Sequence, residues 1–118
     1  MVQTGGKTGP MSAKTYDPRL TEILRRLIEA YQPERIYLFG SHARGDAGPD
    51  SDFDLLVIVP DDAPQERTRS RLAYQVLRGT QLAVEVLAWT RRSFESRLRV
   101  PASLPAVVEC EGKVLYVA

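Results

Sequence analysis

The chain has little of several residue types, and each scarcity narrows what the protein can be. Its one cysteine, Cys110, cannot form an internal disulfide, as expected in a reducing compartment. Its one histidine, His42, has no histidine or cysteine ligand nearby, which argues against a zinc site. No apolar run is long enough to span a membrane, and no secretory leader is recognisable. We therefore expect a cytoplasmic protein without a membrane segment.

Neither sign of charge is in large excess. The sequence has 16 Lys and Arg against 15 Asp and Glu, a net charge of +1. This balance gives no general attraction to nucleic acid or to membranes, so no direct nucleic-acid partner is expected. The length of 118 residues suits one hydrophobic core. Residues 1–15 are polar and rich in glycine, so we expect a flexible arm there and a single domain at 16–118.

Hydrophobic periodicity and turn residues predict a chain of alternating helices and strands. A helix is expected from Asp17, as N-cap, to about Tyr31. Leu55 to Val59 is continuously apolar, which is typical of a central strand covered on both faces. The other expected helices are 41–44, 65–78, 93–98 and a turn before residue 111, and the expected strands are 35–39, 52–59, 81–89 and 114–117.

A glycine at the end of the first predicted strand indicates an anion site. The β-prone run Arg35–Phe39 stops at Gly40, where the lack of a Cβ lets the backbone turn sharply and a ligand approach closely. Ser41 suits the N-cap of a short helix that ends at Gly45. A strand, a glycine and a helix N-terminus in succession present free N–H groups to a phosphate.

Two carboxylates follow on the next predicted strand. Asp52 and Asp54 are two residues apart, so both point to one face of the sheet, and Phe53 and Leu55 point to the other. Like charges this close are tolerated when a divalent cation lies between them, and carboxylate oxygens suit Mg²⁺ or Mn²⁺. A phosphate site beside such a pair predicts phosphoryl or nucleotidyl transfer.

The spacing of these residues resembles a known signature. Gly40-Ser41, ten intervening residues and Asp52-x-Asp54 are similar to the signature of the polymerase-β-like nucleotidyltransferase superfamily. The fuller string, Gly-Ser-x-Ala-Arg-Gly then Ser-Asp-x-Asp-Leu-Leu-Val, resembles its smallest members, the minimal nucleotidyltransferases of toxin–antitoxin modules. The resemblance implies an α/β (α+β) fold, a small mixed β-sheet with helices packed on it.

A third carboxylate lies on the strand predicted at residues 81–89. Glu85 is costly to bury in an apolar strand unless a cation or a hydrogen-bond donor compensates its charge. The alternative to a role in the site is a structural role in which Glu85 forms an ion pair. The family carries a third carboxylate on this strand, more often an aspartate, as base or metal-bound activator. The resemblance thus implies Asp52, Asp54 and Glu85 as catalytic residues and metal ligands.

The resemblance also implies a nucleotide site and a reaction. Gly40 and Ser41 would bind the phosphates of ATP, and Arg44 would either contact phosphate or brace a carboxylate. With Mg²⁺ (or Mn²⁺), AMP would pass to a hydroxyl of a partner protein, a tyrosine of a HEPN-domain toxin, which makes this chain the antitoxin. The acceptor surface would come from that partner, from self-association as a homo-oligomer, or from the acceptor itself. The alternatives are a non-catalytic antitoxin that docks on its partner and a transferase acting on a small molecule such as an antibiotic.

Overall fold

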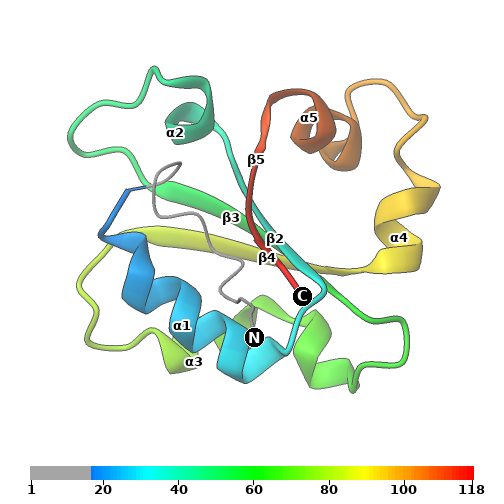
Figure 1. Ribbon diagram of the computed structural model, residues 1–118, viewed down its shortest axis with the longest axis horizontal. Coiled ribbons are helices and arrows are strands. Elements are labelled where there is room, and N and C mark those ends of the chain that lie inside the picture. Colours follow the sequence, from blue (N-terminus) through cyan, green and yellow to red (C-terminus); the bar gives the residue numbers. More distant parts are fainter. Residues whose placement is uncertain (1–16) are drawn as a thin grey trace, which may run out of the picture.

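The computed structural model describes residues 17–118, and the arm predicted for residues 1–15 lies outside the described residues. Helices and strands alternate along much of the chain (Figure 1). The helices are α1 (Leu20–Tyr31), α2 (Ser41–Arg44), the 3₁₀ turn η1 (Gln65–Thr68), α3 (Ser70–Val76), α4 (Arg91–Ser96) and α5 (Leu104–Glu111). The strands are β2 (Arg35–Phe39), β3 (Phe53–Val59), β4 (Val84–Thr90) and β5 (Lys113–Val117).

The four strands form one mixed sheet in the order β4-β3-β2-β5. β3 runs antiparallel to β2 and parallel to β4, and β5 is antiparallel to β2. A small mixed sheet with helices packed on it was the predicted fold class, and it is confirmed. β3 lies inside the sheet with Leu55 to Val59 buried, as its unbroken apolar run predicts.

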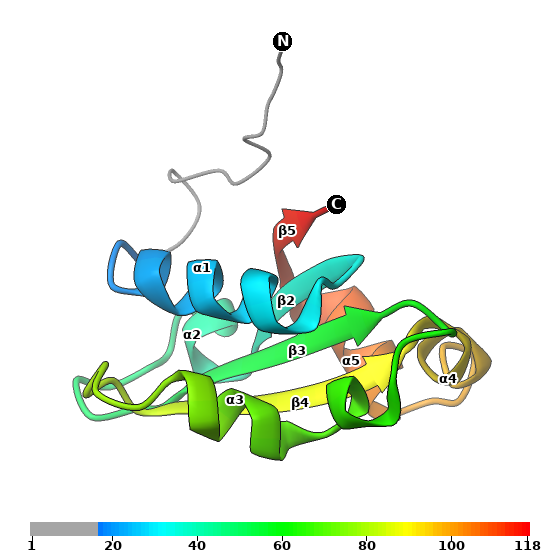
Figure 2. The ribbon, with the colours of Figure 1, turned by 90° about the horizontal axis from the view of Figure 1, so that it is seen from below.

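Helices cover both faces of the sheet. α1 and α3 lie on one face, and α4 and α5 lie on the other (Figure 2). Side chains alternate along β3, so Phe53, Leu55 and Val57 pack with α1, whereas Leu56 and Ile58 pack with α4 and α5. The two clusters use all the apolar positions of β3, and the one polar residue of the strand is Asp54, next to its start.

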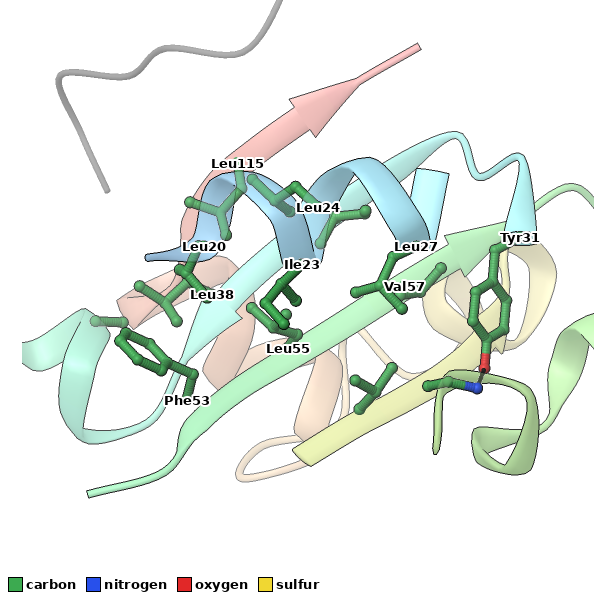
Figure 3. Packing of buried hydrophobic residues seen from close by; sticks show 14 of the residues in the cluster. Leu20, Ile23, Leu24, Leu27, Tyr31, Leu38, Phe53, Leu55, Val57 and Leu115 are labelled. Carbon is green, nitrogen blue, oxygen red and sulfur yellow. Dashed lines mark hydrogen bonds between the residues drawn. The ribbon is translucent and has the colours of Figure 1, made fainter. Parts of the chain in front are cut away.

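The apolar face of α1 forms the larger cluster. Its buried residues recur at helical spacing and meet β2, β3 and β5, as Figure 3 shows. The helix begins at Leu20, with Arg19 in the N-cap position, two residues later than predicted. Asp17 still satisfies this end, because its Oδ1 accepts a hydrogen bond of 2.9 Å from the Arg19 amide. The labelled members in Figure 3 are Leu20, Ile23, Leu24, Leu27, Tyr31, Leu38, Phe53, Leu55, Val57 and Leu115.

The single helix predicted over residues 65–78 is wrong. The segment divides into η1 and α3, because Arg69 between them has extended backbone angles (φ −119°, ψ 141°). The Tyr31 hydroxyl of α1 donates to the Arg69 carbonyl and accepts from the Ala73 amide. A contact with a residue far away in the sequence therefore holds the break, and local propensity did not reveal it.

Other boundaries differ from the prediction by a few residues. β4 begins at Val84 instead of Gln81, whose positive φ of 59° is incompatible with a strand. α4 begins at Arg91 because the Thr90 hydroxyl accepts from the Ser93 amide and caps the helix. The turn expected before residue 111 is the complete helix α5. Among residues 17–118, no helix is both long and apolar enough to cross a membrane.

Candidate active site

The candidate site lies where β2 ends and β3 begins. β2 delivers Gly40, whose backbone angles (φ 75°, ψ −155°) suit glycine. A Cβ at Gly40 would collide with Asp54 Oδ2 and lie 3.1 Å from Asp54 Cγ. The missing side chain therefore allows the Asp54 carboxylate to rest against the backbone that carries the predicted phosphate site.

α2 follows Gly40 at once and is a single turn. Gly45 ends it in the left-handed conformation (φ 87°), with its amide donating to the Ser41 carbonyl at 2.9 Å, as predicted. The predicted N-cap is wrong by one residue: Gly40 takes that position, and Ser41 is the first helical residue. Among residues 17–118, no side chain caps this helix end. The buried Ala43 anchors the turn in the core.

Asp52 and Asp54 reach the site from β3. Asp52 is exposed just before the strand, and Asp54 is half-buried within it, on the face opposite Phe53. Burial raises the pKa of the Asp54 carboxyl, and the negative charges of Glu85 and Asp52 raise it further. Glu85 and Asp52 are therefore close enough to Asp54 to disfavour its ionised form.

Glu85 comes from β4, which lies beside β3 in parallel register. Its Cα is directly paired with that of Asp54, so the two side chains share one face of the sheet. Glu85 is exposed, so the predicted penalty for burying its charge does not apply. Within residues 17–118 it forms no ion pair, which removes support for an ion-paired structural role.

The three carboxylates do not form a closed metal cage. Among the described residues, no three His, Cys, Asp or Glu side chains converge tightly enough to hold an ion. The donor chemistry nevertheless fits a hard divalent cation, because all three groups are carboxylates. The pKa of Asp54 is raised first by burial and then by repulsion from Glu85 and Asp52, and a cation would relieve this repulsion. The assignment of Asp52, Asp54 and Glu85 as ligands stays a prediction.

Arg44, at the end of α2, faces carboxylates. Its Nε donates to Asp46 Oδ2 at 3.2 Å, and its guanidinium lies 3.8 Å from Glu111 Oε1 at the end of α5. These partners are not the predicted ligands Asp52, Asp54 and Glu85, so both roles predicted for Arg44 stay predictions. Both ion pairs are exposed and therefore weak, so a phosphate can compete for the same guanidinium.

His42 makes contacts that the sequence did not reveal. Its Nε2 lies 3.1 Å from the Ser51 carbonyl oxygen, and its ring stacks on Phe53 with the centroids 3.9 Å apart. The position precedes Ala43 in a string whose pattern leaves it unspecified, so no spacing rule pointed to these partners. The contacts join α2 to the residues on either side of Asp52.

The carboxylates lie on an open part of the surface. Hollows of about 310 to 600 Å³ lie elsewhere on the described surface, and their lining does not include Asp52, Asp54 or Glu85. The site therefore offers the exposed ends of neighbouring strands beside a helix N-terminus. Such a surface can bind phosphates and a cation while leaving one side free for a second reactant.

Known proteins share the family and the fold of this chain. The family model of the nucleotidyltransferase domain matches residues 20–110. A crystal structure of a toxin–antitoxin with AMP-PNP shares the fold, with a TM-score of 0.53, 23% identity, and coverage of 82% of this chain and 73% of that one. No match was found among curated proteins.

A second solved structure has the same fold. It is a mutant of the toxin–antitoxin MntA-HpeT in which two aspartates, two positions apart, are replaced by glutamate. Its TM-score is 0.52 at 22% identity, again covering 82% of this chain and 73% of that one. Because the family model spans well over half of the sequence, this chain belongs to the nucleotidyltransferase domain family and is a transferase.

Proposed function

We propose that this protein is the antitoxin of a toxin–antitoxin pair and transfers AMP from ATP to a hydroxyl group of its partner, a tyrosine of a HEPN-domain toxin. The observation that carries the transfer is the close approach of Asp54 to the Gly40 backbone, with Glu85 in register beside it. Groups that donate hydrogen bonds to phosphate then lie beside acidic oxygens at one end of the sheet, as nucleotidyl transfer requires.

The residues of the site divide the work of this reaction, with Glu85 serving both as a metal ligand and as the base. The backbone at Gly40 and the hydroxyl of Ser41 bind the β- and γ-phosphates, and Arg44 leaves its exposed ion pairs to contact phosphate. Asp52, Asp54 and Glu85 would hold Mg²⁺ or Mn²⁺. When bound, the metal neutralises phosphate charge and polarises the phosphorus–oxygen bonds.

The chemistry is one substitution at phosphorus. The acceptor oxygen forms a bond to the α-phosphorus, the bond from that phosphorus to the bridging oxygen breaks, and pyrophosphate leaves. Glu85 takes the proton of the acceptor hydroxyl, and its exposure leaves it accessible to an acceptor that approaches from solvent. Ser41 is placed beside the phosphates and is not a nucleophile.

A protein acceptor suits the open site. Residues 17–118 form one sheet with its helices and include no second domain that would enclose a small acceptor. The two toxin–antitoxin structures that share the fold support a protein partner, and the AMP-PNP in one of them supports an adenine nucleotide. The substituted aspartates of the other have the spacing of Asp52 and Asp54.

The test uses ATP labelled at the α-phosphorus, Mg²⁺ and the protein encoded by the neighbouring gene. We expect label on that protein with the wild type and none with Asp52→Asn/Asp54→Asn. A matched control, Asp62→Asn/Glu66→Gln, removes the same charge from exposed residues at the opposite end of β3 and should label normally.

Two other results would contradict the proposal. If no nucleotide gives label while the two proteins still bind each other, the chain is a docking antitoxin. If label passes only to a small hydroxyl compound, the acceptor is not a protein. Mass spectrometry of the labelled partner identifies the modified side chain and counts the nucleotides added.

A further inference from the structure

The site depends on two segments that pair only as far as Phe39 and Asp54, and beyond this pair α2 and the residues before Asp54 are joined by a loop. Gly40 and Ser41 belong to the entry into α2, whereas Asp52 and Asp54 belong to β3. The intervening loop, residues 45–52, is mostly exposed, and its own hydrogen bonds are local. Because β2 pairs with β3 as far as Phe39 and Asp54, a displacement of α2 would mainly move Ser41 and Arg44 relative to Asp52.

His42, in the first segment, contacts the second segment in two ways, through its Nε2 atom and through the face of its ring. A carbonyl oxygen can only accept a hydrogen bond, so Nε2 must carry a proton and donate to Ser51 O at 3.1 Å. The ring plane lies 18° from that of Phe53 at a centroid distance of 3.9 Å. Ser51 and Phe53 are the two neighbours of Asp52, so His42 contacts the backbone on one side of this carboxylate and an aromatic ring on the other.

His42 contacts the strand from the face opposite the carboxylates. Phe53 is 1% exposed and belongs to the cluster beneath α1, whereas Asp54 points to the other face. The Arg19 guanidinium lies 5.1 Å from the Phe53 ring centroid and is bound by Asp17, which fixes the ring further. His42 is thus well placed to align the site and poorly placed to touch a reacting atom.

We propose that His42 is a positioning residue for nucleotidyl transfer, which locks α2 to the start of β3 and keeps the phosphate site in register with Asp52 and Asp54. The inference rests on the proposed roles of those residues. Misplacing a catalytic group by about 1 Å costs on the order of 100-fold in rate, so loss of the lock affects the reaction strongly.

Three substitutions separate the contributions of the ring. His42→Ala removes the hydrogen bond and the stacking, His42→Phe keeps the stacking, and His42→Gln keeps a donor. We expect His42→Ala to lower kcat about 10- to 100-fold and to raise the Mg²⁺ concentration needed for half-maximal labelling, with KM for ATP changing less. The Phe and Gln variants should recover part of the loss.

A second measurement needs neither metal nor activity. Trypsin needs an extended backbone around the bond it cuts, so cleavage after Arg44, the last residue of α2, becomes faster when this helical turn opens. We expect His42→Ala to accelerate cleavage at Arg44 at least several-fold while cleavage at Arg99, in the loop after α4, stays at the wild-type rate. Equal acceleration at both bonds would mean that His42 only stabilises the fold, and would overturn the proposal.

The two measurements also separate this proposal from the proposed function. If the wild type labels no acceptor, the function fails, and cleavage at Arg44 still decides the role of His42. If the wild type labels its partner and His42→Ala matches it in kcat, Mg²⁺ dependence and cleavage at Arg44, the function stands and the positioning role is overturned.

Discussion

At the residue scale, two glycines that flank α2 differ in what surrounds them. Both have a positive φ, of 75° at Gly40 and 87° at Gly45, so either is strained by a side chain. A Cβ at Gly40 would meet the Asp54 carboxylate, whereas nothing lies within 4 Å of a Cβ at Gly45. Comparing a side chain at Gly40 with one at Gly45 therefore distinguishes the effect of backbone strain from the effect of disturbing the site.

We expect Gly40→Ala to abolish transfer and to destabilise the protein by about 1–3 kcal/mol, because strain and collision combine. Gly45→Ala should destabilise by about 1–2 kcal/mol and retain transfer. Urea unfolding and partner labelling measure the two quantities. Equal activity of the two variants would show that the contact between Gly40 and Asp54 is not needed.

At the element scale, one side chain ties α1 to α3. Tyr31 ends the apolar face of α1, as Figure 3 shows. Its hydroxyl donates to the Arg69 carbonyl and accepts from the Ala73 amide, 3.0 Å away. Ala73 is fully buried, so water does not replace a missing partner there. The same hydroxyl thus satisfies the start of α3 and maintains the break after η1.

We expect Tyr31→Phe to lower the free energy of unfolding by about 1–3 kcal/mol, because it leaves a buried amide and a carbonyl without partners. Tyr74→Phe is the matched control: Tyr74 is 55% exposed, and its change should stay within about 0.5 kcal/mol. Urea denaturation of both variants measures these changes in the free energy of unfolding. A Tyr31→Phe protein as stable as the control would show that the hydroxyl contributes nothing.

At the scale of the whole molecule, the carboxylates of the site oppose folding. The pKa of Asp54 is raised above its ordinary value of 3.8, first by burial and then by Glu85 and Asp52. A raised pKa favours the protonated form in the folded state, so its stabilising effect is present below about pH 4 and is lost as the pH rises through the folded-state pKa. Ionised Asp54 therefore weakens the fold at neutral pH.

We expect Asp54→Asn to be more stable than the wild type at pH 7 and to lose this advantage on acidification below pH 4, while transfer is abolished. Thermal unfolding across this pH range, without metal, measures the difference. Asp62→Asn, at the exposed turn after β3, should follow the wild type. A less stable Asn variant at pH 7 would contradict the repulsion among the carboxylates.

Local signals predicted much of the fold and the candidate site. The run Arg35–Phe39 and the apolar positions of α1 were read correctly, because their spacing reports which face is buried. Asp52 and Asp54 were placed on one face by strand alternation alone. The pairing of Glu85 with Asp54 needed the further assumption, now confirmed, that their strands are neighbours.

The sequence by itself determined the order of elements, the turn at Gly40 and the spacing of the two aspartates, since each depends on residues close together in the chain. The tertiary structure alone decided the break at Arg69, the exposure of Glu85 and the stacking of His42 on Phe53. These features depend on partners distant in sequence or on the packing of neighbouring elements. Local propensity and periodicity carry no information about such contacts.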